Sequence, residues 1–258
     1  MISLLSPAKN LSFEPSPNGF KPSIPQFIEE SEVLINKLKK LSPNKISKLM
    51  KLNPQLSELN YHRYQNWRAD FEEVESKAAI YAFNGEVYRG LSAIDFTQKD
   101  LDFAQEHLII LSGLHGILKP LDLIQPYRLE MGTKLQIRSK IPNLYMFWKD
   151  KITASLNALL EEQNEKVILN LASIEYFKSV DVADLNARVI HCQFLDWKGE
   201  SYKAVMTWAK LARGMMAKKV ITEKIDNAEE LKGVAFGGYL FNDSMSTEDN
   251  FVFTRDKS

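Results

Sequence analysis

LIILSGLHGILKPLDLIQPYRLEMG, residues 108–132, is the stretch around which the predicted fold is organised. It begins with the short apolar run 108–111, which is typical of a strand buried on both faces of a sheet. Gly113 and Gly116 follow, and two glycines so soon after a strand let the backbone turn sharply or approach another segment closely. The stretch ends with Arg128 and Glu130. Loops at strand ends carry ligand-binding residues as well as residues that pair with one another, so both roles remain open here.

The composition of the chain is that of an ordinary soluble globular protein. Of its 258 residues, 45% are hydrophobic and 26% are charged, and this length is enough for a substantial core. Lys and Arg number 33, as do Asp and Glu, so the net charge gives no global attraction to nucleic acid or membrane. Any such attraction must come from local clusters of charge.

The cysteine count and the apolar runs indicate the compartment. The single cysteine, Cys192, excludes a disulfide within the chain and fits a reducing cytosol. No apolar run approaches the length that a membrane-spanning helix needs, and the first residues lack the layout of a signal peptide. We therefore expect a cytoplasmic protein that does not associate with membranes.

Hydrophobic periodicity predicts one compact domain over residues 1–258, of mixed α/β (α+β) class, with a central mixed sheet wrapped by helices. The predicted strands are residues 2–5, 108–111 and 167–169, a hairpin of 189–195 and 202–206, and an edge strand at 251–254. The predicted helices are residues 26–40, 43–51, 54–67, 74–83, 97–107, 143–160 and 207–224. The lysine-rich helical unit of residues 26–67 is expected to be an insertion in this domain.

Three of the predicted strands are followed by polar residues. If the strands at 2–5, 108–111 and 167–169 are parallel neighbours, their carboxyl ends lie side by side, where open α/β sheets bind ligands. Cations together with hydroxyl and amide groups suit an anion such as the phosphate of DNA or of a nucleotide. The alternative is a structural network in which these groups satisfy one another. The residues expected at this site are Lys9, Arg128, Glu130, Asn170, Ser173, Tyr176 and Lys178, with Arg213 arriving from the basic helix.

Two runs of basic residues are candidates for binding DNA. The first contains six lysines, and no acidic residue occurs between Val33 and Ser57. A lysine run is often only a solvated face, but a second run on the helix 207–224 favours a cleft between two positive surfaces. The residues expected to contact DNA are Lys37, Lys39, Lys40, Lys45, Lys48 and Lys51 in the first run, and Lys210, Arg213 and Lys218 in the second.

The first run is similar to a helix-hairpin-helix, in which backbone N–H groups of a turn between two short helices bind phosphates. It departs from that pattern because the turn reads Leu41-Ser42-Pro43-Asn44, without paired glycines. Pro43 at the start of a helix still exposes the N-terminal amides of that helix.

Metal and redox chemistry find little support in the sequence. The four histidines have no zinc-type spacing, and the chain contains no pair of cysteines. No phosphate-binding loop, dinucleotide fingerprint or nucleophile elbow occurs. We therefore expect neither a metal nor a cofactor.

The central stretch resembles the signature of the peroxide stress protein YaaA family. The likeness continues through further blocks that span essentially the whole chain: residues 6–9, 82–85, 87–88, 90–91, 144–145, 147–148, 170–173, 175–180 and 212–216. The resemblance implies a protein made during peroxide stress that limits oxidative damage to DNA and lowers free intracellular iron. It also implies binding of double-stranded DNA without sequence specificity, through a positive cleft and a helix-hairpin-helix-like unit.

Two hypotheses follow from the sequence. The first is a monomeric protein of the oxidative-stress response that binds double-stranded DNA and limits iron-dependent damage to it. The second is an enzyme that acts on a small phosphorylated or nucleotide-like ligand in the pocket at the strand ends. No catalytic residue is assigned, and the first hypothesis is preferred.

Overall fold

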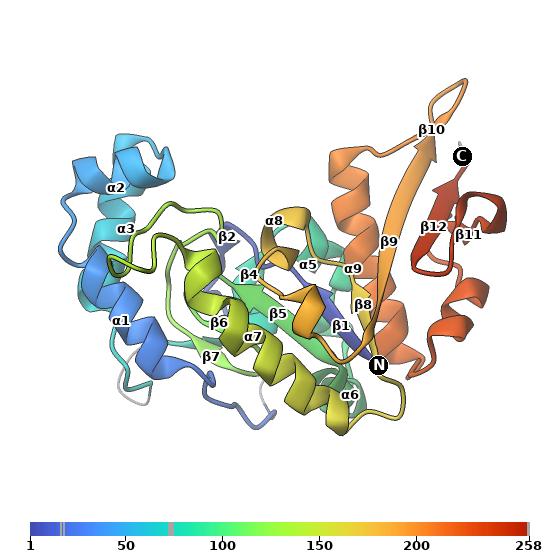
Figure 1. Cartoon of the computed structure of the whole chain (residues 1–258), viewed down its shortest axis with the longest axis horizontal. Coiled ribbons are helices and arrows are strands. Elements are labelled where there is room, and N and C mark those ends of the chain that lie inside the picture. Colours follow the sequence, from blue (N-terminus) through green and yellow to red (C-terminus); the bar gives the residue numbers. More distant parts are fainter. Residues whose placement is uncertain (16, 18, 72–74, 257–258) are drawn as a thin grey trace.

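Parallel strands form the centre of the sheet in the computed structural model, which describes residues 1–15, 17, 19–71 and 75–256 (Figure 1). The order across the sheet is β11-β12-β9-β8-β1-β5-β6, and β10 pairs with β9. The strands from β12 to β5 are parallel to their neighbours, whereas β6, β10 and β11 pair antiparallel. The prediction of a mixed α/β fold with a central mixed sheet wrapped by helices is confirmed.

The strands of this sheet are β1 (Ile2–Leu5), β5 (Leu108–Ser112), β6 (Gly116–Leu118), β8 (Val167–Asn170), β9 (Arg188–Trp197), β10 (Tyr202–Lys203), β11 (Leu240–Phe241) and β12 (Asn250–Arg255). Short two-residue strands form two further pairs, namely β2 (Asn10–Leu11) with β4 (Phe83–Asn84), and β3 (Lys77–Ala78) with β7 (Leu123–Ile124). The α-helices are α1 (Ile28–Leu38), α2 (Pro43–Met50), α3 (Pro54–Asn66), α4 (Ala79–Ala82), α5 (Glu86–Leu91), α6 (Gln98–His107), α7 (Leu144–Glu161), α8 (Ile174–Phe177) and α9 (Met206–Thr222). The 3-10 helices are η1 (Ala93–Asp95), η2 (Val182–Asp184), η3 (Ala228–Gly233) and η4 (Asp243–Met245).

The three strands predicted to be parallel neighbours are adjacent in the sheet. β1 lies between β5 and β8, with Leu4 opposite Ile109 on one side and Asn170 on the other. Every residue of these three strands is buried, as expected for apolar runs covered on both faces. In Figure 1, α7 covers the near face of the sheet, and α5 and α6 lie behind it.

Most predicted helices agree with the structure to within two or three residues, because capping residues mark their ends. Ser42 precedes α2, which begins at Pro43, and Asn53 accepts a hydrogen bond from the Leu56 N–H at the start of α3. Thr97 forms a capping box with Asp100 at the start of α6. The Asn53 and Thr97 side chains satisfy backbone groups that the first helical turn leaves free, whereas the Ser42 side chain makes no such bond.

Three predicted elements need correction. The segment 251–254 is not an edge strand, because β12 lies between β11 and β9 and residues 251–253 are all buried. The predicted helix 74–83 is helical only in α4; its residues 77–78 instead form β3, which pairs with β7, and residue 74 is outside the described residues. The second strand of the hairpin, β10, has only two residues. Pairing between distant segments decided the first two cases, and local periodicity does not predict such pairing.

The two glycines of the central stretch have the roles that their spacing indicated. A β-carbon at Gly113 would overlap the carbonyl oxygen of Leu129, so the turn after β5 touches the backbone of the loop that follows β7. Gly116 has a φ of +69° and lies against the ring of Trp148, where a β-carbon would come within 2.7 Å. The turn thereby holds the 127–132 segment against the end of β5.

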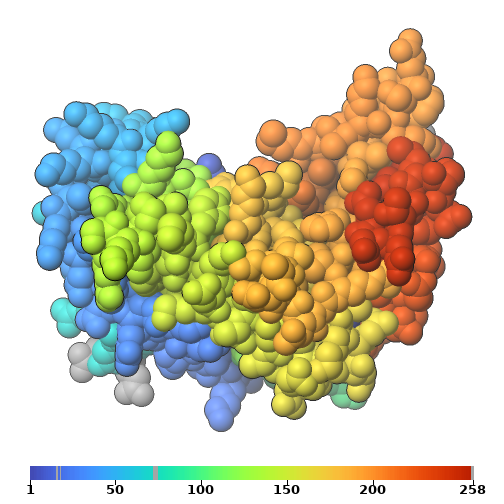
Figure 2. Space-filling view, viewed as in Figure 1, coloured from blue at the N-terminus to red at the C-terminus, as the bar shows by residue number. Residues whose placement is uncertain are grey.

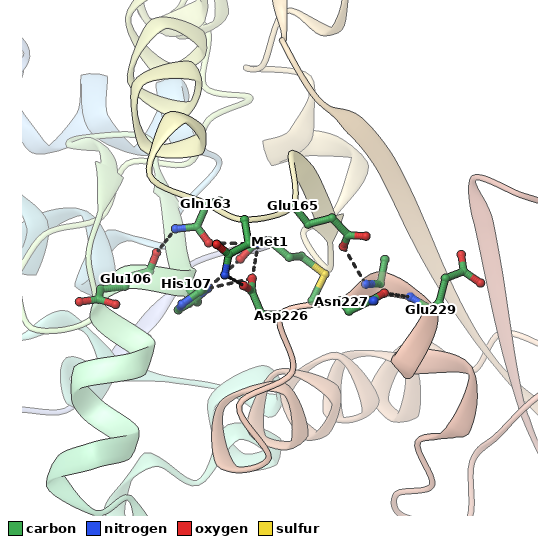
Figure 3. A network of polar contacts seen from close by, with 10 residues as sticks. Met1, Glu106, His107, Gln163, Glu165, Asp226, Asn227 and Glu229 are labelled. Carbon is green, nitrogen blue, oxygen red and sulfur yellow. Dashed lines mark hydrogen bonds and ion pairs between the residues drawn. The ribbon is translucent and has the colours of Figure 1, made fainter.

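A partly buried polar network lies at the opposite end of the sheet, where β1 begins (Figure 3). The Met1 ammonium group forms an ion pair with Asp226 at 2.5 Å and donates to Gln163 Oε1 at 3.0 Å. His107 Nδ1 lies 3.0 Å from the Met1 carbonyl oxygen. Burial raises the pKa of Asp226, but its hydrogen bonds from the ammonium group and Asn164 outweigh this and lower the pKa below its ordinary value. The network fixes β1 to the segment after α9. In the described part of the chain, no helix is long and apolar enough to cross a membrane.

Candidate functional site

A cavity of about 450 Å³ lies at the carboxyl ends of β1 and β8. Its lining comes from segments that are far apart in the sequence: residues 6–10 after β1, residues 84–88 at the start of α5, residues 127–130, then Ser173, Glu175 and Tyr176 around α8, and Lys210 and Arg213 of α9. The chain leaves β1 toward β5 on one side and adds β8 on the other, so the cavity lies where the strand order reverses. Open α/β sheets bind ligands at such a point.

The charged centre of the pocket is Glu130, which lies between two cations. Lys9 Nζ is 2.7 Å from Glu130 Oε2, and Arg128 Nη2 is 2.9 Å from Glu130 Oε1. Burial raises the pKa of Glu130, but the hydrogen bonds from Lys9 and Arg128 outweigh it, so the pKa falls below its ordinary value. Arg128 is largely buried, whereas the Lys9 side chain is 62% exposed. A ligand can therefore reach Lys9 without disrupting the Arg128–Glu130 pair.

Serine side chains join the ends of β1 and β8. Ser6 Oγ accepts a hydrogen bond from the Ser173 backbone N–H at 2.9 Å and lies 3.2 Å from Ser173 Oγ. This contact fixes the loop after β1 to the start of α8, so that Ser173 and Glu175 face the same cavity as Lys9. Glu175 is held in turn by the Gly132 N–H, at 2.9 Å.

Three tyrosines line the deeper part of the pocket. The Tyr88 hydroxyl donates to the Ser6 carbonyl oxygen at 3.1 Å, and the Tyr127 hydroxyl is 2.7 Å from Ser112 Oγ. Burial is the main cause that raises the pKa of Tyr88, Tyr127 and Tyr176 above the ordinary value for a phenol. All three phenols therefore remain protonated at neutral pH and act as hydrogen-bonding groups rather than as charges.

Arg213 and Lys210 close the pocket from α9. Burial lowers the pKa of Arg213, and its guanidinium remains charged because free arginine titrates far above neutral pH. Four cations thus line the pocket, Lys9, Arg128, Lys210 and Arg213, together with three carboxylates, Glu86, Glu130 and Glu175. Within the described residues the four cations and three carboxylates give the lining a formal charge of +1.

The structure brings most of the predicted pocket residues together. Those that line the cavity are Lys9, Arg128, Glu130, Ser173, Tyr176 and Arg213. Asn170 does not: its side-chain nitrogen lies 3.0 Å from His191 Nδ1, and its oxygen accepts from the Ala172 N–H at 3.0 Å. Lys178 follows α8 and is exposed to solvent away from the lining. The structural alternative thus holds for Asn170 and in part for the Lys9–Glu130–Arg128 group.

Other lining residues escaped the sequence-based prediction. They include Ser6, Asn10, Asn84, Glu86, Tyr88 and Tyr127, while Lys210 is among the residues expected to contact DNA. Asn10 and Asn84 lie opposite each other in the β2–β4 pair. Strands of two residues are too short to produce a periodic pattern, so the sequence does not predict this contact. The one available signal was position, because Ser6 directly follows the predicted strand 2–5.

The lysine-rich unit forms α1, α2 and α3. Lys37, Lys40, Lys45, Lys48 and Lys51 are exposed, and among the described residues no carboxylate lies within 4 Å of their ammonium groups. Lys39 differs, because its ammonium group donates to the Trp67 carbonyl oxygen at 3.0 Å and its side chain is half-buried. The unit therefore presents five solvated cations, while the sixth lysine braces α1 against the end of α3.

A buried tyrosine links this unit to the pocket. The Tyr64 hydroxyl, on α3, donates a hydrogen bond to the backbone carbonyl of Arg128. Tyr64 is fully buried, and burial raises the pKa of its phenol. The segment that carries Arg128 and Glu130 is thus fixed to the helical unit through its backbone.

The lysines on α9 and just after it are placed differently from those of the first run. Lys218 forms an ion pair with Asp95 at 2.8 Å, Lys224 pairs with Asp100 at 2.6 Å, and Lys219 pairs with Glu223. Lys210 and Arg213 lie on the part of α9 that faces the pocket. Only these two cations of the predicted second run are directed toward the strand ends.

Figure 2 shows that the surface is hollowed between the lobe of the lysine-rich unit, in blue, and the lobe that contains the β9–β10 hairpin, in orange. In Figure 1, α8 and the β2–β4 pair, which carry pocket residues, lie between these two lobes. The pocket therefore belongs to the floor of the hollow. Of the residues that can be described, no group of three or more His, Cys, Asp or Glu side chains is placed to hold a metal ion.

Comparison with known proteins gives a consistent result. Residues 1–245 match the family model described as peroxide stress protein YaaA. A UPF0246 protein from Colwellia psychrerythraea is 46% identical over 258 residues and covers all of both chains. UPF0246 proteins from Saccharophagus degradans and Verminephrobacter eiseniae are each 46% identical, over 255 and 256 residues, and cover 99% of this chain and 99% and 98% of their own.

Proposed function

This chain belongs to the peroxide stress protein YaaA family, and from that premise we propose that it binds double-stranded DNA without sequence specificity and so limits oxidative damage to it. Membership of the family supports a general role in the oxidative-stress response. The proposed action on DNA is that of a monomer in the cytoplasm. The observation that carries the proposal is the set of five exposed, unneutralised lysines on α1, on α2 and in the turns that follow these two helices.

The charge pattern of this surface suits a phosphate backbone. Sequence-independent binding to DNA draws on cations that displace counterions from phosphates, and it needs no contact with base edges. The overall balance of 33 basic and 33 acidic residues means that the attraction is local to the unit. Pro43 begins α2 after Ser42, whose side chain does not cap the helix. The Lys45 and Ile46 N–H groups donate to the Ser42 carbonyl oxygen, which leaves the Asn44 N–H of the first turn for a phosphate.

The hollow beside this unit supports a cleft for the duplex. Lys210 and Arg213 stand on its opposite side, and the ion-paired Lys218 contributes less than the sequence indicated. We assign the first DNA contacts to Lys37, Lys40, Lys45, Lys48 and Lys51, with Lys210 and Arg213 across the hollow. Shielding of DNA at this surface would reduce its exposure to iron-dependent oxidation. The effect on free iron in cells belongs to the same proposal.

The test is the affinity for a fixed duplex as a function of salt. Changing Lys40, Lys45 and Lys48 together to Ala is expected to weaken binding equally for unrelated sequences. The slope of log affinity against log salt should become shallower by about 2–3, because each phosphate contact contributes roughly 0.9. Strand breakage by Fe(II) and peroxide should rise in parallel when the variant replaces the wild type in the assay.

A matched control removes the same charge elsewhere. Lys21, Lys99 and Lys166 are exposed and lie outside the lysine-rich unit and the pocket, so the triple Ala variant of these residues should retain both affinity and slope. Equal slopes for the wild type and for the Lys40, Lys45 and Lys48 variant, with folding intact, would remove this surface from the interface.

The second candidate function is catalysis on a small phosphorylated or nucleotide-like ligand. The pocket favours it, because Arg128 and Arg213 are largely buried cations beside Ser173 and Glu175. Turnover of a nucleotide by the protein in the absence of DNA would support this candidate over the first.

A further inference from the structure

We propose that the pocket receives one nucleotide unstacked from the bound duplex, and that Ile174 fills the place which that nucleotide leaves in the stack. The inference rests on the DNA binding proposed above and gives the pocket a role in it. Three features carry the inference: the place of the pocket, the chemistry of its lining, and one exposed apolar side chain at its rim.

The place of the pocket is the floor of the hollow in Figure 2. A duplex held by the lysines of α2 and by Lys210 would lie over this floor. The Tyr64–Arg128 hydrogen bond fixes the pocket wall to the lysine-rich unit, so DNA bound to the unit is held in a defined position relative to the pocket.

The lining suits a whole nucleotide better than a phosphate alone. Its volume of about 450 Å³ is within the range of about 300–1,000 Å³ typical of sites for small organic ligands. The formal charge of +1 is small for a site devoted to phosphate. The amide groups of Asn10 and Asn84 can donate to and accept from the edge of a base, while the ammonium groups of Lys9 and Lys210 can bind its phosphate.

Ile174 supplies the apolar group. It begins α8 between Ser173 and Glu175, which both line the pocket, yet its own side chain is 77% exposed. The Ser6–Ser173 hydrogen bond holds its backbone in place. Proteins that unstack bases insert apolar side chains such as Ile between base steps, and enzymes that extrude a nucleotide receive it in a pocket next to that point.

The experiment uses a duplex with 2-aminopurine, a base whose fluorescence is quenched by stacking, at one central position. The full-length protein is added to saturation, and binding is followed separately by the anisotropy of a dye on the DNA end. We expect the fluorescence of 2-aminopurine to rise several-fold on binding of the wild type. The rise should be much smaller for Ile174→Ala, measured again at saturation.

Two further variants assign the effect to the pocket. Ser173→Phe fills the cavity without removing the Ser173 backbone N–H that bonds Ser6, and it should abolish the rise in fluorescence. Val182→Ala is the control for truncation, because Val182 on η2 is 54% exposed and does not line the pocket; it should behave as the wild type.

The outcomes separate the two proposals. Saturated binding of the wild type without a rise in fluorescence would overturn the unstacking inference and leave DNA binding intact. A full rise with Ser173→Phe would also overturn it, because the base would then leave the stack without entering the pocket. A lack of DNA binding by anisotropy would overturn both proposals.

Discussion

Gly214 of α9 lies directly against the backbone of Val87 in α5. A β-carbon at position 214 would overlap the Val87 carbonyl oxygen and stand 2.7 Å from the Leu91 N–H nitrogen. Gly90 makes the reciprocal contact with the carbonyl oxygen of Leu211. The two helices can approach this closely only because both positions lack a side chain. Their crossing places Arg213 of α9 beside the segment 84–88, and so builds one side of the pocket.

Replacement of Gly214 should therefore disturb both stability and the pocket. We expect Gly214→Ala to lower the free energy of unfolding by about 1–3 kcal/mol, the usual cost of adding a methyl group to a filled core. Denaturant titration measures the loss. Gly233→Ala is the matched control, since a β-carbon there meets nothing within 4 Å and should change stability little. Equal stabilities for the two variants would refute the close-packing argument.

The Glu130 carboxylate should make stability depend on pH in the acid range. Its pKa is lower in the folded than in the unfolded chain, so its contribution is complete above the unfolded value of about 4.3 and is lost as pH falls through the folded value. Glu130→Gln should cost on the order of 1–2 kcal/mol at pH 7, and the difference from wild type should shrink below pH 4. Denaturant titrations from pH 3 to pH 7 test this. Glu32→Gln, on the exposed face of α1, should differ from wild type by less than about 0.5 kcal/mol.

A phosphorylated ligand should stabilise the folded protein through the pocket cations. A nucleoside monophosphate at a hundredfold excess over its dissociation constant adds about 2.7 kcal/mol and raises the melting temperature. The rise should disappear in Arg128→Ala. Loss of DNA binding in the same variant would indicate one shared site, whereas retained DNA binding would indicate a separate ligand pocket. An unchanged rise in Arg128→Ala would remove Arg128 from the site.

Cys192 should not act as a peroxide sensor. Burial raises the pKa of its thiol to about 12, even though Arg213 opposes this, so the reactive thiolate is scarce at neutral pH. The chain also has no second cysteine to resolve a sulfenic acid. Alkylation of the folded protein by N-ethylmaleimide should be slow and should accelerate in denaturant. Cys192→Ser should protect cells from peroxide as well as wild type does; loss of protection by a folded, equally abundant variant would contradict this.

The sequence by itself determined those strands and helices that are specified by residues close together in the chain. Apolar runs marked β1, β5 and β8, and residues such as Ser42, Pro43 and Thr97 marked helix ends, because a strand or a helical turn is specified by residues a few positions apart. The shared carboxyl edge of the three strands also followed, since parallel neighbours end on the same side. The exposed positive charge of α2 also followed from the sequence, because the run of lysines contains no nearby acidic residue that could neutralise it.

Only the tertiary structure decided which side chains meet. Lys9 pairs with Glu130 across more than a hundred residues, Asn170 turns to His191 rather than to the pocket, and Lys218 is neutralised by Asp95. Such pairings depend on the register of distant strands and on the crossing of α5 and α9. Periodicity in a single sequence predicts which face of a helix or strand is buried. It does not predict which other element packs against that face.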